Sequence, residues 1–371
     1  MVKLFDTLSR EVIPFEPGPE VTIYTCGITP YDATHVGHAA AFVTFDVLQR
    51  RLRDLGCRTK CVRNITDVDD DILRKARELG VHYLDLAAEE IARFDSDMRA
   101  LGLLAAFSEP RATSAIPDIL RFIDLVLSSG HAYRSGGSVY FRVSSFPAFG
   151  QLSRLGRDEM IELARDRGGR PEDPNKEDPL DFVLWQPSEA DEPSWESRWG
   201  RGRPGWHAEC SALAMRELGS TIDIHGGGED LIFPHHECEI AQSEAATGEQ
   251  FVRHWVHVGM VRLGGQKMSK SLGNLIFVSD LLKEWEPDVI RLAVLSNHYR
   301  SSWEWSTDLL ATARERLERW RSGAGKGRVA LDEVRGMLDD DLNTPGAIQA
   351  LDSLSDRGGI SLGASLLGVS L

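Results

Sequence analysis

Residues 21–38 read VTIYTCGITPYDATHVGH, and the predicted architecture starts from this stretch. Residues 21–25 are apolar or β-branched and predict a short buried strand. The loop 26–30 contains glycine and proline, and an apolar helical pattern then runs from about residue 35 to 55. A second strand is predicted over 59–64. Strand, helix and strand joined by short glycine-containing turns are typical of a doubly wound α/β sheet.

Beyond this stretch, the sequence changes character several times along its 371 residues. A charged run rich in glycine and proline, DRGGRPEDPNKEDP (166–179), predicts an insertion between two halves of the core. Core patterning resumes with a predicted helix over 206–218, a strand over 221–225 and a helix over 235–247. After residue 267 the pattern is helical to the end, with a break near 322–327. The predicted regions are a core half (1–101), the insertion (102–204), the second core half (205–262), a helical domain (263–321) and a short helical region (322–371).

Composition indicates a globular protein of the cytoplasm. No stretch approaches the roughly 20 apolar residues of a membrane span, and the opening MVKLFDTLSR has no apolar leader. The formal net charge is -15, and no dense Lys/Arg block offsets it, which weakens a nucleic-acid-binding role. The five scattered cysteines argue against a disulfide framework. Three of them are predicted to be structural: Cys57, Cys61 and Cys238.

Two histidines stand one helical turn apart in His35-Val36-Gly37-His38, at the predicted start of the first helix. Their side chains would point the same way, beside the backbone N–H groups and the positive end of the helix. That arrangement suits the phosphates of an adenine nucleotide. Histidines at this spacing are also compatible with a structural role, so the motif alone leaves both interpretations open.

A second motif, KMSKS at 267–271, lies in a loop flanked by glycine and serine. Lys267 and Lys270 can neutralise the charge that develops on a leaving pyrophosphate. Lysines at this spacing would, on their own, be equally typical of a solvated basic loop. The order HxGH followed by KMSKS is far more specific, and it resembles the signature of the class I aminoacyl-tRNA synthetases.

Candidate zinc ligands come from three segments of the chain. Cys26 ends the first strand, Cys210 lies on the helix predicted over 206–218, and His235 and Glu239 are four residues apart on a third segment. Residues i and i+4 share a helix face, as two ligands from one helix must. Zinc would favour the thiolate of a bound thiol, and such a site would reject serine. The wide spacing predicts this site only weakly, and Glu239 could equally be a solvated helix residue.

A third motif, DIHGGGED at 223–230, runs from a predicted strand into three glycines and two acids. The three glycines would permit close approach of a nucleoside, and Asp230 would accept a hydrogen bond from a ribose or an amine. A tight turn is the alternative interpretation of the same residues.

Over nearly its whole length the chain resembles the cysteinyl-tRNA synthetase superfamily. The matching strings are NITDVDD (64–70), DFVLW (181–185), GRPGWHAECSA (202–212), GGGEDLIFPHHE (226–237) and KMSKS. This resemblance implies a class I, Rossmann-like, doubly wound parallel sheet with an inserted connective subdomain and a C-terminal helical region. Within the superfamily, CGITPYDATH (26–35) and DRGGRP (166–171) look more similar to the mycothiol-pathway ligases, which join cysteine to the amine of glucosaminyl-inositol.

The resemblance also implies roles for individual residues. It implies one zinc ion per chain, with ligands Cys26, Cys210 and His235. The residues implied to contact the cysteinyl moiety or the adenylate are Gly27, Thr29, Thr66 and Trp206. Those implied to hold ATP, accompanied by Mg²⁺, or its adenosine are His35, His38, Gly228 and Asp230. Lys267 and Lys270 would stabilise the transition state in which pyrophosphate leaves.

Two departures from the ligase pattern concern the acceptor. Glu239 occupies the position of the fourth zinc ligand of the tRNA synthetases, where the ligases lack a carboxylate, and Ala41 replaces a threonine of the adenylate site. The leading hypothesis is a ligase acting on L-cysteine, ATP and an amino sugar. A compact cysteinyl-tRNA synthetase is the alternative, disfavoured because the sequence ends soon after DLNTP (341–345). A third hypothesis is an inactive cysteine sensor, and the two intact motifs argue against it.

Overall fold

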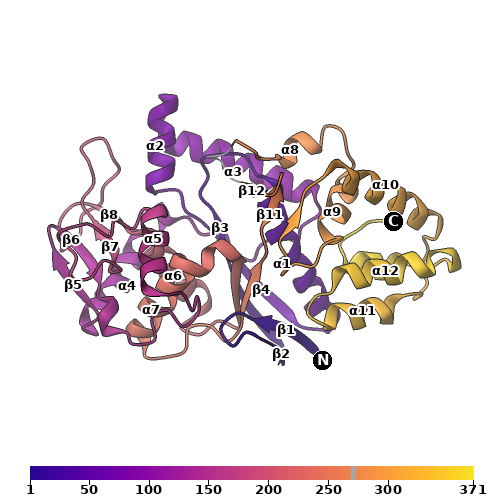
Figure 1. Cartoon of the computed structure of the whole chain (residues 1–371), viewed down its shortest axis with the longest axis horizontal. Helices are drawn as coiled ribbons and strands as arrows, with labels where there is room; N and C mark the ends of the chain where they lie inside the picture. The colour runs from indigo at the N-terminus through magenta and orange to yellow at the C-terminus, as the bar shows by residue number, and fades with distance from the viewer. Residues whose placement is uncertain (269–272) are drawn as a thin grey trace.

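The centre of the molecule is a four-stranded parallel sheet in the order β10-β9-β3-β4 (Figure 1). The computed structural model describes residues 1–268 and 273–371. The four strands span Trp255–Val258, Ile224–Gly228, Glu20–Ile28 and Arg58–Ile65. β3 pairs in parallel with β4 on one side and with β9 on the other. The predicted doubly wound α/β fold is therefore confirmed, with β3 as the strand on which the winding reverses.

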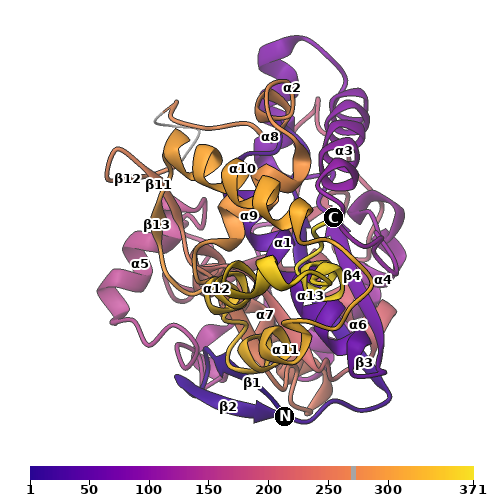
Figure 2. The same cartoon turned by 90° about the vertical axis from the view of Figure 1, so that its right-hand side faces the viewer.

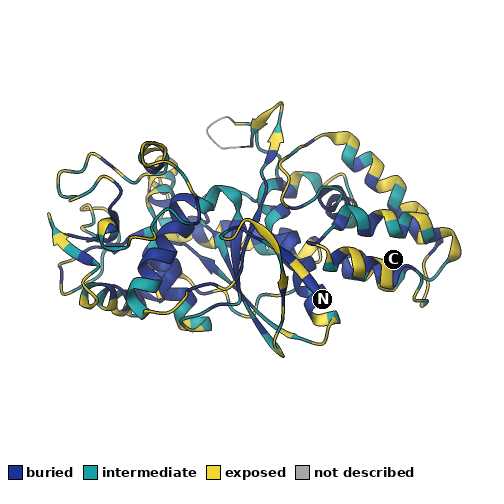
Figure 3. Cartoon of the chain, turned by 60° about the horizontal axis from the view of Figure 1, so that its bottom comes forward, coloured by how far each residue is buried: buried dark blue, intermediate teal, exposed yellow. Residues whose placement is uncertain are grey.

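Burial on both faces explains why β3 is apolar. Val21, Ile23 and Tyr24 are fully buried, as expected for a parallel strand covered by helices. Helix α1 (Val36–Asp54) follows β3 and packs against the sheet with residues at helical spacing, including Val36, Ala40 and Val43. Figure 3 shows these central elements in the colour of buried residues, with the exposed residues gathered at the periphery.

A second unit occupies the place of the predicted insertion, at the left of Figure 1. Its antiparallel sheet has the order β5-β6-β7-β8, and its core is rich in aromatic residues such as Phe141, Phe182 and Trp185. The strands are Ala132–Ser135, Ser138–Phe141, Phe182–Gln186 and Arg203–Pro204. The helices around it and before it are α2 (Asp70–Leu79), α3 (Tyr83–Ala100), α4 (Ile116–Ser128) and α5 (Arg157–Asp166). The residue boundaries assigned to the five regions stay predictions.

The chain returns to the central sheet through α6 (Trp206–Leu218), which matches its predicted range. Two other predictions need correction. The strand predicted over 221–225 lies at Ile224–Gly228, because the glycines themselves pair with β10. A Cβ at Gly226 would lie 1.8 Å from the Val256 carbonyl oxygen, so only glycine fits there. The helix predicted over 235–247 begins with a π turn, Ile232–His236, and continues as α7, Glu237–Thr247.

Helices form the opposite end of the molecule, at the right of Figure 1 and facing the viewer in Figure 2. They are α8 (Val278–Leu281), α9 (Pro287–Leu295), α10 (Thr307–Ser322), α11 (Leu331–Asp339), α12 (Thr344–Leu354) and α13 (Ser361–Leu366). A buried ion pair between Arg291 of α9 and Asp46 of α1 joins this end to the core.

The prediction that the chain is helical from residue 267 to its end was wrong at one place. Trp303–Glu304 forms β13, which lies beside β11.

Two short sheets complete the fold. β1 (Val2–Asp6) and β2 (Glu11–Phe15) form a hairpin. β11 (Val261–Leu263) lies between β12 (Gln266–Lys267) and β13. Within residues 1–268 and 273–371, none of the helices combines the length and apolar character needed to cross a bilayer.

Candidate functional site

The candidate site lies at the carboxyl ends of β3 and β9. The chain leaves β3 through α1 towards β4, whereas β9 and β10 extend the sheet on the other side of β3. Ligands of open α/β sheets bind where the strand order reverses in this way. Cys26 and Gly27 lie near the end of β3, and Gly228 ends β9, so two of the predicted motifs meet at this point.

Four predicted metal ligands come together here from four different elements. One atom each from Cys26, Cys210, His235 and Glu239 lies within 4.8 Å of the other three. Cys210, His235 and Glu239 are at most 1% exposed. Neither His235 Nε2 nor Glu239 Oε1 has a hydrogen-bond partner among the described residues. Two thiols, an imidazole and a carboxylate match the ligand chemistry of zinc, and the unpartnered polar atoms fit a bound cation.

Two further histidines, which the sequence did not single out, stand behind this cluster. His225 Nε2 lies 3.1 Å from Glu239 Oε2, and His236 Nε2 lies 3.3 Å from Cys26 Sγ. With Cys26 and Glu239, they form a second group of atoms close enough to share an ion. His225 lies within DIHGGGED and His236 within GGGEDLIFPHHE, two strings already noted. Only the pairing of β9 with β3 brings them next to Cys26.

Hydrogen bonds hold the second of these histidines in place. His236 Nδ1 lies 2.7 Å from His257 Nε2, and His257 Nδ1 lies 2.7 Å from the Thr7 hydroxyl. His235 is held separately, because its Nδ1 lies 2.8 Å from His207 Nδ1 and Trp206 stacks on its ring at 4.1 Å. Such outer contacts fix the tautomer and orientation of metal-binding imidazoles.

The electrostatics of the cluster favour neutral side chains until a cation binds. Burial raises the pKa of the Cys26 thiol well above its usual value, and hydrogen bonding to Cys210 and the charge of Glu239 add to the rise. Burial also raises the pKa of Glu239 and lowers those of His235 and His236. A divalent cation would reverse the preference of the thiol and carboxyl groups, because its charge stabilises their anions.

The two histidines of the HVGH motif lie side by side at the start of α1. Their rings stack with centroids 3.8 Å apart, and His35 Nδ1 accepts a hydrogen bond from the Gly37 N–H at 3.1 Å. Backbone hydrogen bonds join HVGH to the segment that follows KMSKS. The Val36 N–H donates to the Ile276 carbonyl, and the Val278 N–H donates to the Thr34 carbonyl. Regions 240 residues apart thus meet at the N-terminus of α1.

Lys267 reaches the same edge of the sheet from β12. Its Nζ lies 3.0 Å from Asp230 Oδ2, and both side chains remain partly exposed. The insertion reaches this point too, because Arg167 Nη1 donates to the Asp230 carbonyl at 2.6 Å. Lys270, the second predicted lysine, falls in 269–272 and so lies outside the described residues. Lys267, Asp230 and Arg167 together form a charged rim suited to a polyphosphate with its cation.

The residues predicted to contact the cysteinyl group gather around the end of β3. The Gly27 N–H donates to Asn64 Oδ1 at 2.9 Å, and a Cβ at Gly27 would lie 1.6 Å from the Asn64 carbonyl oxygen. Asn64 Nδ2 in turn donates to the Thr66 hydroxyl at 3.1 Å. The Thr29 hydroxyl donates to Asp69 Oδ2 at 3.2 Å. Close approach of β3 and β4 therefore requires glycine at position 27. Asn64 holds Thr66, and Asp69 holds Thr29.

Two acids that the sequence did not assign also lie here. Asp69 caps α2 by accepting from the Ile72 N–H, and burial raises its pKa to about 7. Glu209 of α6 is 0% exposed, and neither of its carboxylate oxygens has a hydrogen-bond partner among the described residues. Burial raises the pKa of Glu209 well above its usual value, and the negative groups Cys210, Asp69 and Asp67 raise it further.

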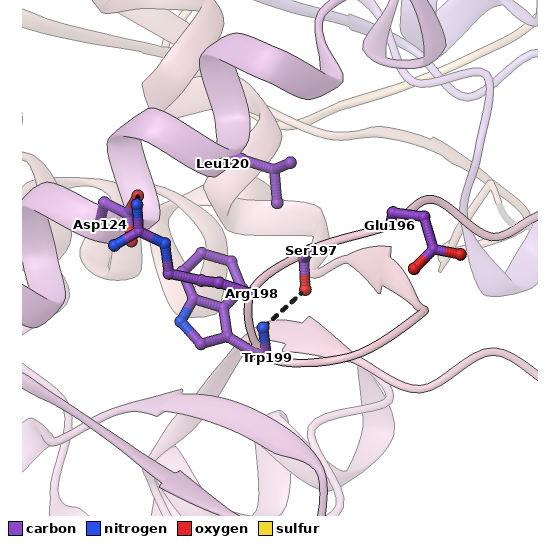
Figure 4. A pocket seen from close by; sticks show the side chains of 6 residues that line it. All are labelled: Leu120, Asp124, Glu196, Ser197, Arg198 and Trp199. Carbon is purple, nitrogen blue, oxygen red and sulfur yellow. Dashed lines mark hydrogen bonds and ion pairs between the residues drawn. The ribbon is translucent and has the colours of Figure 1, made fainter.

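A surface hollow on the insertion is separate from this site. Figure 4 shows Arg198 extending towards Asp124 across the hollow, where their charged groups lie 3.2 Å apart. None of the predicted site residues lines it. Since its arginine is already paired, the hollow gives no indication of a charged ligand.

Comparisons with known proteins agree with this geometry. A family model described as "tRNA synthetases class I (C) catalytic domain" matches residues 14–315. The L-cysteine:1D-myo-inositol 2-amino-2-deoxy-alpha-D-glucopyranoside ligase of Streptosporangium roseum is 46% identical over 376 residues, covering 99% of this chain and 92% of the relative. The Mycobacterium ulcerans protein of the same name is 48% identical over 361 residues, covering 95% and 88%.

Solved structures with the same fold are more distant in sequence. Mycobacterium tuberculosis methionyl-tRNA synthetase in complex with methionyl-adenylate has a TM-score of 0.68 at 15% identity, covering 94% of this chain and 89% of that one. A Campylobacter jejuni protein described as a putative arginyl-tRNA synthetase has a TM-score of 0.61 at 13% identity, covering 96% and 94%. At these identities the likeness concerns the fold alone.

Proposed function

The chain belongs to the family of class I tRNA synthetase catalytic domains, and on that premise we propose that it is an AMP-forming ligase that activates L-cysteine with ATP. The cysteinyl group then passes to the amine of glucosaminyl-inositol, 1D-myo-inositol 2-amino-2-deoxy-α-D-glucopyranoside. The observation that carries the proposal is the meeting of Cys26, Cys210, His235 and Glu239. The HVGH motif, which follows β3, and Lys267, which pairs with Asp230 after β9, belong to the same edge of the sheet. A thiol-binding centre next to a nucleotide site suits activation of cysteine.

The first step is adenylate formation. The cysteine carboxylate attacks the α-phosphorus of Mg·ATP, and the bond to the bridging oxygen breaks, so that cysteinyl-adenylate forms and pyrophosphate leaves. His35 and His38 at the positive end of α1 would hold the phosphates, and Lys267 would turn from Asp230 to the departing pyrophosphate. Most of the acceleration would come from positioning and charge neutralisation.

The substrate thiol is the group by which cysteine is selected. We propose Cys26, Cys210 and His235 as ligands of a zinc ion, with Glu239 as the fourth. When bound, zinc favours the thiolate form of the substrate and offers serine only a poor contact. Trp206, stacked on His235, and the backbone at Gly27 would pack against the cysteinyl group.

The second step is amide formation. The unprotonated amine of the amino sugar attacks the carbonyl carbon of cysteinyl-adenylate, and the C–O bond to AMP breaks. The products are the amide, AMP and one proton.

We also propose that the reaction takes place in the cytoplasm, since all five cysteines are free thiols.

A second candidate function is charging of tRNA-Cys, and Glu239 favours it. Its carboxylate lies within the four-residue cluster, where the resemblance implies an acid in the tRNA synthetases and none in the ligases. Radiolabelled cysteine, ATP and zinc-loaded protein should be incubated with glucosaminyl-inositol in one reaction and with tRNA-Cys in another. We expect labelled amide in the first reaction and no acid-precipitable label in the second. Charged tRNA without amide would overturn the proposed acceptor.

A further inference from the structure

Glu209 is a buried acid that the mechanism above does not use. It lies on α6, which Figure 1 places between the insertion and the central sheet. Its side chain is 0% exposed, and neither carboxylate oxygen accepts a hydrogen bond from any described residue. A buried carboxylate without partners is costly, and chains seldom retain one unless a ligand or a cation completes it.

Position on the helix directs this carboxylate towards the substrate. Residues i and i+3 share a helix face, so Glu209 lies on the side of α6 that carries Trp206, and Cys210 is the next residue of the helix. Trp206 stacks on His235, and Cys210 belongs to the metal cluster. Two residues of α6 within one turn of Glu209 therefore belong to the predicted cysteine site or contact it.

The charged groups around Glu209 indicate which kind of ligand would pair with its carboxylate. The acidic groups that act on it are Cys210, Asp69 and Asp67. Arg203 is the cation that opposes them, but its guanidinium is already bound to Asp70 and Glu192. The described groups around Glu209 thus offer it no free cation, since Arg203 is already paired. An acidic pocket of this kind suits a cationic ligand, and the α-ammonium group is the one cation that cysteine carries.

Resting on the proposed function, we infer that Glu209 binds the α-ammonium group of the amino-acid substrate. The pocket would then bind two groups of the substrate: the metal cluster would bind the sulfur, and Glu209 would bind the nitrogen. The carboxylate of the substrate would remain directed to ATP. A charged hydrogen bond in a dry pocket strongly favours ligands that carry the ammonium group. A ligand without this group leaves the buried carboxylate without a hydrogen-bond partner.

The test compares cysteine with 3-mercaptopropionate, which has the same thiol and carboxylate but no ammonium group. Wild-type protein, Glu209→Gln and Glu209→Asp are assayed by ATP–pyrophosphate exchange with each compound. Glu217→Gln, on the same helix and paired with Arg216, is the control. We expect the wild type and the control to prefer cysteine by about 10²-fold or more in kcat/KM. In Glu209→Gln the preference should fall by about 10- to 100-fold, with zinc content and the KM for ATP unchanged.

Thermal melting separates this role from a structural one. Removing an uncompensated buried acid should leave the melting temperature of the substrate-free protein unchanged or higher, while the rise on adding cysteine shrinks. A lower melting temperature with an unchanged preference for cysteine would show that Glu209 is structural and would overturn the inference.

Two further outcomes are also decisive. If Glu209→Gln does not fold, Glu209→Asp decides, since it keeps the charge but retracts it, and an undiminished preference there would also overturn the inference. Absence of exchange in the wild type would instead count against the proposed function.

Discussion

The two halves of the candidate site differ in how they are built. The sulfur half, Cys26, Cys210, His235 and Glu239, is carried on β3, α6, the π turn and α7 and is almost entirely buried. The phosphate half, with Lys267 and Asp230, is partly exposed and borne on short strands and turns. A thiol can be recognised in a dry, rigid pocket, whereas a polyphosphate must enter and leave with its charge. The two halves should therefore fail in different ways when mutated.

The largest effect is expected in the sulfur half. Cys210→Ser should lose zinc and reduce kcat/KM for cysteine by at least about 10³-fold, since a hydroxyl cannot replace a buried thiolate ligand. Metal analysis measures the zinc content, and ATP–pyrophosphate exchange measures kcat/KM for cysteine. Cys57→Ser, on a half-buried cysteine away from the cluster, is the matched control. Unchanged zinc content in Cys210→Ser would remove this residue from the metal site.

Next in size is the phosphate half. Lys267→Ala should lower kcat for pyrophosphate exchange by about 10²- to 10³-fold, because a charge that meets the leaving pyrophosphate is lost. Zinc content should stay at the wild-type level. Lys283→Ala, which removes an exposed lysine paired with Asp280, should behave as wild type. Loss of zinc in Lys267→Ala would contradict the separation of the two halves.

A smaller effect is expected behind the sulfur half. His257→Ala removes the partner of His236 Nδ1 and should weaken zinc binding about 10- to 100-fold, as measured by competition with a chelator. His254→Ala, at a buried histidine that instead contacts the Leu4 carbonyl, serves as the control. Equal zinc affinity in the two variants would mean that the His236–His257 contact does not support the metal.

The smallest effect concerns Asp69, which holds Thr29. Its pKa is raised from 3.8 to about 7, so between these pH values the folded chain keeps a proton that the unfolded chain has lost. The free energy of unfolding should therefore fall as pH rises from 4 to 7, by about 3 kcal/mol from this group. Urea melts of Asp69→Asn, in which an amide still caps α2, should show a shallower fall. An identical pH dependence in both proteins would refute the raised pKa.

The sequence predicts the phosphate half better than the sulfur half, and the reason is physical. His35 and His38 are one helical turn apart, so local geometry alone places them together. Cys26, Cys210 and His235 meet only because β9 pairs with β3 and α6 packs over that edge, which no local spacing reveals. His225, His236 and Glu209 were missed for the same reason.

The fold was predictable where periodicity is strong, as in α1 and α6, and less so where glycine or short strands intervene. β9 continues through Gly226–Gly228, since paired glycines can form a strand that turn propensity alone does not suggest. β13 at Trp303–Glu304 exists only because β11 lies beside it. In both places tertiary pairing overrides the local signal.

The most direct test of cysteine activation at a metal-bound thiol site is amino-acid-dependent ATP–pyrophosphate exchange with cysteine and with serine. The assay is run on zinc-loaded protein, on chelated protein and after zinc is restored. We predict exchange with cysteine, a preference over serine of about 10⁴-fold or more, loss on chelation and recovery with zinc. Exchange that proceeds equally well with serine, or with cysteine after the metal has been removed, would contradict the account.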